Sequence, residues 1–220
     1  MMIWHRFRSL TLQRILKSLA GTGGEEVNIM KKLFSLLFVL FACVVSYGQD
    51  SLDVTHFLGI PVDGTKEEVM SKLKAKGFVN MPDDDEILVG EFNGKNVFVN
   101  VRANNQKVFL ISVLDVNACD ESQIKTSFNN LCRQFKNDSK YISFSDHTIP
   151  ESEKIGHEML VNKKIYTAYF FQKPKVVSGG YEDLSNRVVW FTINVESNDS
   201  SQYRILMYYV NGYNEPKDGD

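Results

Sequence analysis

The sequence lacks the features of several protein classes. It has only three cysteines and five prolines in 220 residues, too few for a disulfide-rich scaffold or a proline-rich low-complexity chain. Its longest apolar run, residues 33–45, is shorter than the roughly 20 residues that cross a bilayer, which argues against a membrane span. It has no block of basic residues, so nucleic acid is not an expected partner.

Catalytic and metal-binding motifs are also missing. The sequence has no Gly-x-Ser-x-Gly elbow, no Walker loop and no dinucleotide fingerprint. His147 and the pair His157-Glu158 are candidate zinc or active-site residues, but no two histidines have the i, i+4 spacing of zinc proteases. The acidic residues 83–86 are consecutive, unlike the alternating ligands of a calcium loop. We therefore expect no metal, no cofactor and no catalytic residues, with a secreted hydrolase-type enzyme as the alternative.

An export signal is present instead. Lys31 and Lys32 follow Met30 and precede the apolar run, and small residues surround Tyr47 just before Gln49. A basic start, a short apolar region and a small-x-small site are typical of a secretory signal peptide. We expect residues 30–48 to be that signal and residues 1–29 to be an untranslated or non-structural leader. The protein is then periplasmic or extracellular.

Lipid attachment is the alternative fate of this segment. Residues 40–43, LFAC, resemble in part a bacterial lipobox, in which Cys43 would be acylated and the protein would become an outer-membrane lipoprotein or lipid-anchored scaffold. Phe41 is bulky for its place, and Val44 and Val45 follow where polar residues are usual. Cleavage before Gln49 is therefore the preferred interpretation.

The part that follows the signal has the composition of a mildly acidic globular domain. Six of the 25 basic and two of the 27 acidic side chains precede residue 49, which leaves a net charge of about −6. Its two cysteines, Cys119 and Cys132, are separated by about twelve residues of predicted helix, or roughly 18 Å. A disulfide needs Cα atoms within about 7 Å, so we expect free thiols.

Two helices are predicted from their N-terminal caps. Thr65 and Glu68 form a capping box ahead of a helix over residues 66–76, which Gly77 ends. Asp120 and Gln123 give a second capping signal, and apolar residues at helical spacing extend that helix to about residue 136.

Strands fill most of the remaining chain. Asn93-Gly94 is a strong hairpin signal because both residues tolerate positive φ. Alternating apolar residues predict strands over residues 86–92, 95–102, 107–116, 141–144, 158–161, 164–172, 187–196 and 202–211. The longest irregular segment is residues 173–186. These elements predict an α+β fold with two helix-plus-antiparallel-meander units, residues 49–118 and 119–220. Together they form one compact domain whose sheet is covered on one face by two helices.

Large apolar side chains occupy both faces of the last three strands, which is unusual for a sheet with one face in water. Either the second face is covered by the 173–186 loop or by the other unit, or it is an exposed platform for a protein or glycan partner. The anchors of such a platform would be Trp190, Tyr166, Tyr208 and Arg204, since aromatic residues and arginine dominate binding hot spots.

Four short segments carry a resemblance to known proteins. FLGIPVDGT (57–65) and LKAKGF (73–78), with the Gln49-Asp50 start and VNGYN (210–214), resemble uncharacterised secreted proteins of Bacteroidetes. More distantly, the helix-plus-meander repeats resemble β-lactamase-inhibitor-like and outer-membrane assembly lipoprotein folds. That resemblance implies binding to other proteins through a sheet face. We therefore expect an exported, non-enzymatic binding or interaction protein of the bacterial cell envelope.

Overall fold

The computed structural model describes residues 53–174 and 184–217, all within one compact unit, Leu52–Asp220. The expected leader, the signal peptide, Cys43 and the middle of the 173–186 loop lie outside the described residues.

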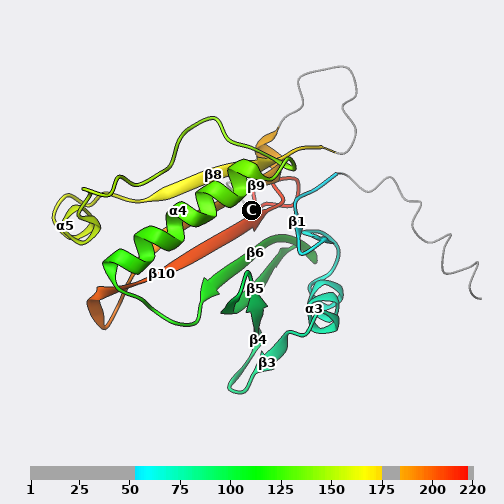
Figure 1. The fold of residues 1–220 in the computed structure, drawn as a ribbon. Coiled ribbons are helices and arrows are strands. Elements are labelled where there is room, and N and C mark those ends of the chain that lie inside the picture. Colours follow the sequence, from blue (N-terminus) through cyan, green and yellow to red (C-terminus); the bar gives the residue numbers. More distant parts are fainter. Residues whose placement is uncertain (1–52, 175–183, 218–220) are drawn as a thin grey trace, which may run out of the picture. The chain divides into compact units, whose positions relative to one another are not determined.

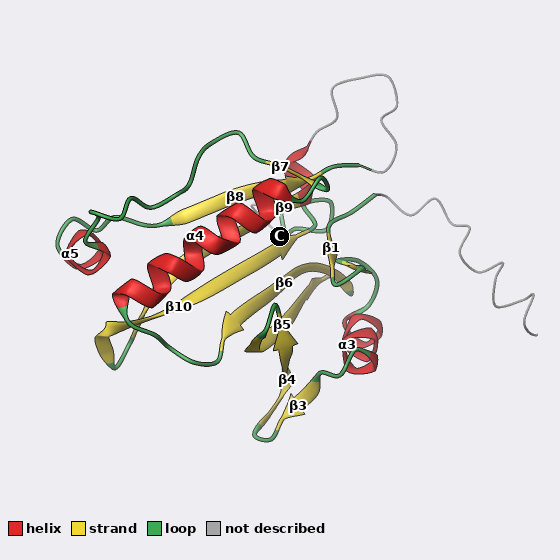
Figure 2. Ribbon diagram, viewed as in Figure 1, coloured by secondary structure: helices red, strands yellow, loops and turns green. Residues whose placement is uncertain are grey.

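Each half of the compact unit contributes one long helix and four strands of the large sheet (Figures 1 and 2). The N-terminal half holds β1 (His56–Phe57), β2 (Ile60–Pro61), α3 (Lys66–Ala75), β3 (Val79–Met81), β4 (Asp84–Phe92), β5 (Lys95–Asn104) and β6 (Lys107–Asp115). The C-terminal half holds α4 (Glu121–Asn137), β7 (Tyr141–Ile142), α5 (Ile155–Leu160), β8 (Thr167–Gln172), the 3-10 turn η1 (Leu184–Arg187), β9 (Val188–Glu196) and β10 (Asp199–Val210).

Eight of these strands form one antiparallel sheet in the order β3-β4-β5-β6-β10-β9-β8-β7. The other two, β1 and β2, form a small separate hairpin. Each half is a four-strand meander that follows its helix. The two meanders meet because their last strands, β6 and β10, pair in the middle of the sheet. The predicted α+β fold is therefore confirmed.

Local sequence signals account for the start of both long helices. Thr65 and Glu68 form the predicted capping box of α3, and Asp120 and Gln123 form that of α4. Each box satisfies backbone N–H groups that the first turn of a helix leaves without an internal partner. Gly77, with φ of 97°, ends the first helix as expected.

The hairpin at Asn93-Gly94 is also confirmed. Both residues have positive φ, 54° and 75°, and Phe92 pairs with Lys95 across the turn. Positive φ at both positions gives a turn whose twist matches that of the strands, and so it sets the register of β4 on β5.

The predicted strand over residues 158–161 is wrong. Residues Ile155–Leu160 form the short helix α5, in which the N–H of Glu158 donates to Lys154 and the N–H of Val161 donates to His157. A short apolar stretch does not distinguish strand from helix by its spacing. The neighbouring strand β8 correspondingly begins at Thr167 rather than at Lys164.

One face of the sheet is packed beneath the helices. A buried row runs in register across six strands, through Leu88, Val99, Val113, Met207, Phe191 and Ala168. Val69 and Leu73 of α3 and Ile124 and Phe128 of α4 belong to the same buried cluster. Both long helices therefore cover this one face, as predicted. Among the helices of the described residues, none is long and apolar enough to span a membrane.

Candidate functional site

The other face of the sheet has no helix over it within the described residues. Burial alternates along β10, where Tyr203, Ile205, Met207 and Tyr209 are buried and the residues between them are only half-buried. We call the side that carries these half-buried residues the open face. It is nevertheless rich in large apolar groups, which a purely solvated sheet face would not carry.

An aromatic row crosses the open face at its C-terminal half. Tyr169 on β8 lies opposite Trp190 on β9, which lies opposite Tyr208 on β10. The ring centroids of Trp190 and Tyr208 are 4.0 Å apart with planes 23° apart, and those of Tyr169 and Trp190 are 6.0 Å and 30° apart. The row continues in register through Ser112, Asn100 and Ile87 to the other half of the sheet. We call Tyr169, Trp190 and Tyr208 the aromatic row.

Exposed apolar groups extend this row towards the sheet edge. Ile165 is 75% exposed and Tyr169 is 47% exposed, and both belong to the segment that enters and forms β8. Phe144 is 73% exposed and contacts Phe171 of β8, with ring centroids 5.4 Å apart. Monomeric proteins rarely expose adjoining large apolar side chains, so this arrangement is the candidate interaction surface of the chain.

Positive charge borders the row. Nε of Arg204 contacts the Glu196 carboxylate at 2.7 Å, and both side chains are partly accessible. Arg102 lies close enough to Tyr208 to oppose the effect of burial, which raises the pKa of that hydroxyl. A polar and charged border around an apolar centre is the usual anatomy of a protein interface.

The structure places three of the four predicted anchors on this face. Trp190 and Tyr208 are directly paired, and Arg204 lies opposite Asn194, which shares the face of Trp190. Tyr166 does not join them, because it is 6% exposed, belongs to the buried core and donates a hydrogen bond to the Glu153 carboxylate at 2.6 Å. The tyrosine beside Trp190 is Tyr169. The register of β8 on β9 decides which tyrosines share that face, and neither strand's own pattern reveals it.

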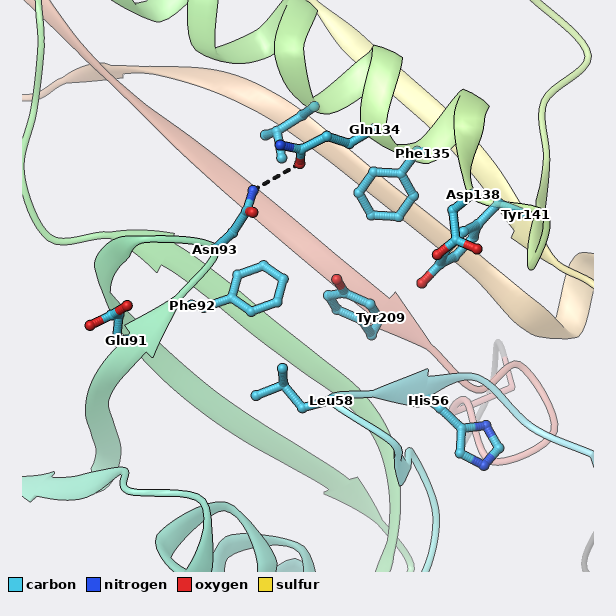
Figure 3. A pocket seen from close by; sticks show the side chains of 11 residues that line it. His56, Leu58, Glu91, Phe92, Asn93, Gln134, Phe135, Asp138, Tyr141 and Tyr209 are labelled. Atoms are coloured by element: carbon cyan, nitrogen blue, oxygen red, sulfur yellow. Dashed lines mark hydrogen bonds between the residues drawn. The ribbon is translucent and has the colours of Figure 1, made fainter.

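The helix-covered side contains a cleft between the two halves, drawn in Figure 3. It has a volume of about 380 Å³, and its walls come from β1, the β4–β5 hairpin, α4, β7 and β10. Two hydrogen bonds from side-chain amides connect the elements around the cleft. Asn93 donates to the side-chain oxygen of Gln134 at 2.9 Å, and Gln172 donates to the backbone carbonyl of His56 at 2.9 Å. No sequence motif indicated this cleft, because its residues come from five separate elements.

The residues considered for catalysis have structural contacts of their own. Nε2 of His147 accepts from the backbone N–H of Tyr169 at 3.3 Å, and the imidazole contacts the ring of Phe170. His157 and Glu158 lie on α5, where the Glu158 carboxylate accepts from Asn162 at 2.8 Å. In residues 53–174 and 184–217, no three His, Cys, Asp or Glu side chains are grouped as metal ligands.

The acidic run also has local partners. Asp84 accepts from the backbone N–H of Glu86 at 2.9 Å, Asp85 accepts from Asn80 at 3.0 Å, and Glu86 pairs with Lys66 of α3. These side chains therefore support the β3–β4 hairpin and its contact with the helix rather than converging on one point.

Cys119 and Cys132 are both free thiols, as predicted. Cys132 lies on the buried face of α4, where desolvation raises its pKa to about 12. Desolvation also raises the pKa of Cys119, although the charge of Lys95 opposes it. A thiol that stays protonated at neutral pH is a poor nucleophile, so neither cysteine is suited to catalysis.

Comparison of the chain with protein-family models, with curated proteins and with solved structures found no match. The function is therefore inferred from the residues and the fold of the chain itself.

Proposed function

We propose that this chain is an exported, non-enzymatic binding protein of the bacterial cell envelope, and that its partner docks on the open face of the sheet. The observation that carries the proposal is the aromatic row of Tyr169, Trp190 and Tyr208, in register on three adjacent strands with no helix above it among the described residues. Tryptophan, tyrosine and arginine are the residues that most often dominate binding energy at interfaces.

The geometry of the row favours a protein over a glycan. A ligand that stacks flat, such as a sugar ring, needs an open aromatic face, but both faces of Trp190 have a tyrosine neighbour. Trp190 and Tyr208 stack on each other, so the rims of these two rings, rather than the faces that they share, are available to a partner. These edges offer apolar area with hydrogen-bond donors, which is what Trp and Tyr supply at protein interfaces.

Sequence features support the cellular setting. The basic, apolar and small-residue order over residues 30–48 favours secretion, and the resemblance of residues 57–65 and 73–78 to secreted Bacteroidetes proteins agrees with it. A lipid anchor at Cys43 remains the alternative route to the same compartment. Intact-mass measurement of the native protein distinguishes the two, since acylation at Cys43 adds lipid mass and cleavage before Gln49 does not.

Site-specific crosslinking tests the docking surface. A photoreactive phenylalanine analogue at position 169 should crosslink one defined protein in the cell envelope, and Trp190→Ala in the same chain should abolish that product. The matched control carries the analogue at Val79, which is 62% exposed on edge strand β3 at the far side of the sheet. A product that forms equally from position 79, or that survives Trp190→Ala in a folded protein, contradicts the proposal.

A further inference from the structure

We infer that the cleft on the helix-covered side is a binding site for a small, uncharged organic molecule with an apolar body and a hydrogen-bond acceptor. This site is separate from the open face, because its residues point to the opposite side of the sheet. Its volume of about 380 Å³ lies within the range of small-molecule pockets.

Aromatic side chains build the cleft from both halves of the chain. Phe92 stands on the side of the β4–β5 hairpin, and Phe135 and Tyr141 stand on the other side with ring centroids 4.6 Å apart. Tyr209, on the central strand β10, lies between these walls (Figure 3). The ring of Phe57 packs against that of Tyr209, with centroids 4.8 Å apart. The interior of the site is therefore apolar and held by packed rings.

One polar group in the cleft lacks a partner. Tyr209 is only 3% exposed, yet its hydroxyl forms no hydrogen bond with any of the described residues. The hydroxyl points into the space that the other lining side chains surround (Figure 3). Burial raises the pKa of Tyr209 well above its usual value, so the group is a neutral donor. Solvent in the cleft reaches this hydroxyl, and an acceptor atom on a bound ligand would take the place of that solvent as its hydrogen-bond partner.

A second donor faces the same space. The hydroxyl of Tyr141 accepts a hydrogen bond from Gln172 at 3.1 Å, which leaves its own proton available. Desolvation raises the pKa of this phenol, and the charge of Asp138 adds to the effect, so it too remains protonated. Two phenol donors over an aromatic floor fit one carbonyl or hydroxyl oxygen on an otherwise apolar molecule.

Charge at the rim excludes anions. Asp138 lines the cleft, the carboxylate of Glu91 at its border is turned away from the other lining side chains (Figure 3), and the described lining contains no lysine or arginine. An anionic ligand would lose its hydration without gaining a cation as a partner, and it would meet the carboxylate of Asp138 instead. The site therefore discriminates between an amide and the carboxylate of the same size and shape.

The experiment uses 2-phenylacetamide and phenylacetate as matched probes, with affinities measured by saturation-transfer NMR titration on the purified protein. We expect 2-phenylacetamide to bind at least tenfold more tightly than phenylacetate. Tyr209→Phe should weaken 2-phenylacetamide at least fivefold without lowering the melting temperature, whereas Tyr208→Phe on the open face should leave the affinity unchanged. Absence of saturation transfer from the wild-type protein to 2-phenylacetamide, or wild-type affinity in Tyr209→Phe, would overturn the inference.

Removal of the rim charge gives a second test that does not depend on Tyr209. Asp138 accepts a hydrogen bond from the backbone N–H of Lys140, which an asparagine oxygen can also accept, so Asp138→Asn should leave the fold intact. This variant should bind phenylacetate at least threefold more tightly than the wild type does, because it removes the carboxylate that lines the cleft. An unchanged phenylacetate affinity would place the probe elsewhere on the protein and so contradict the assignment.

Discussion

Trp190 of β9 and Tyr208 of β10 lie directly opposite each other and stack with ring centroids 4.0 Å apart. This contact joins two strands on the open face, where no helix covers either ring among the described residues. Aromatic pairs of this kind contribute about 0.5–1.5 kcal/mol beyond the area that they bury. The stack therefore stabilises the sheet as well as presenting a surface.

A double-mutant cycle measures that contribution. Trp190→Ala and Tyr208→Ala should each lower the free energy of unfolding, and the double variant should lose about 1 kcal/mol less than the sum of the two single losses. Urea unfolding of the four proteins supplies the values. If the losses are additive within about 0.3 kcal/mol, the two rings do not stabilise each other.

How much of this fold the sequence predicts depends on the kind of signal. Caps and turns are local, so Thr65, Asp120 and Asn93-Gly94 locate two helices and a hairpin correctly. The segment at Ile155–Leu160 is too short and too apolar for its spacing to distinguish helix from strand, and its contacts with α4 are non-local.

The candidate site is predicted less completely, for a related reason. The alternation of side chains along β9 and β10 shows that Trp190, Tyr208 and Arg204 share a face. Which tyrosine of the neighbouring strand lies beside Trp190 depends on how β8 pairs with β9. Both faces of that strand carry aromatic groups, so its pattern does not show that Tyr169 rather than Tyr166 meets Trp190. The cleft around Tyr209 depends on five elements and leaves no motif in the sequence.

Gly90 is a position where any side chain would collide with the core. A Cβ at this position would lie 2.4 Å from Cδ1 of Phe78, far inside van der Waals contact. Gly90→Ala should therefore cost about 1–3 kcal/mol of unfolding free energy, because Phe78 is 3% exposed and has little room to move. Chemical denaturation checks the value.

The same collision predicts a rescue. In a Phe78→Ala background the ring is gone, so adding Gly90→Ala should cause no further loss of stability. If Gly90→Ala destabilises both backgrounds equally, backbone freedom at Gly90 rather than contact with Phe78 explains the effect.

The two thiols should differ in reactivity. Cys132 is 5% exposed and its pKa is raised to about 12, whereas Cys119 is only partly buried. At pH 8 iodoacetamide should therefore label Cys119 faster than Cys132 in the folded protein, and both should react quickly in denaturant. Peptide mass spectrometry over a time course gives the two rates. Faster labelling of Cys132 in the native state would contradict its burial against the sheet.

The buried tyrosines predict a loss of stability at alkaline pH. Burial raises the pKa of Tyr141, Tyr166, Tyr203, Tyr208 and Tyr209 in the folded protein. In the unfolded chain they ionise near pH 10, so the unfolded state releases these protons first. The stabilisation is fully present below about pH 10 and is lost as the pH rises from the unfolded pKa towards the folded pKa, with a limiting slope of about 1.4 kcal/mol per pH unit for one tyrosine.

Tyr209→Phe isolates one of these groups. Between pH 8 and pH 11 the variant's free energy of unfolding should fall less steeply than that of the wild type, by up to about 1.4 kcal/mol per pH unit above pH 10. Tyr213→Phe is the matched control, because Tyr213 is 42% exposed and its hydroxyl is not enclosed by the core. Urea unfolding at each pH gives the slopes. If Tyr209→Phe and the wild type have parallel pH dependences, the Tyr209 phenol ionises as readily in the folded protein as in the unfolded chain, and the closed aromatic floor of the cleft is incorrect.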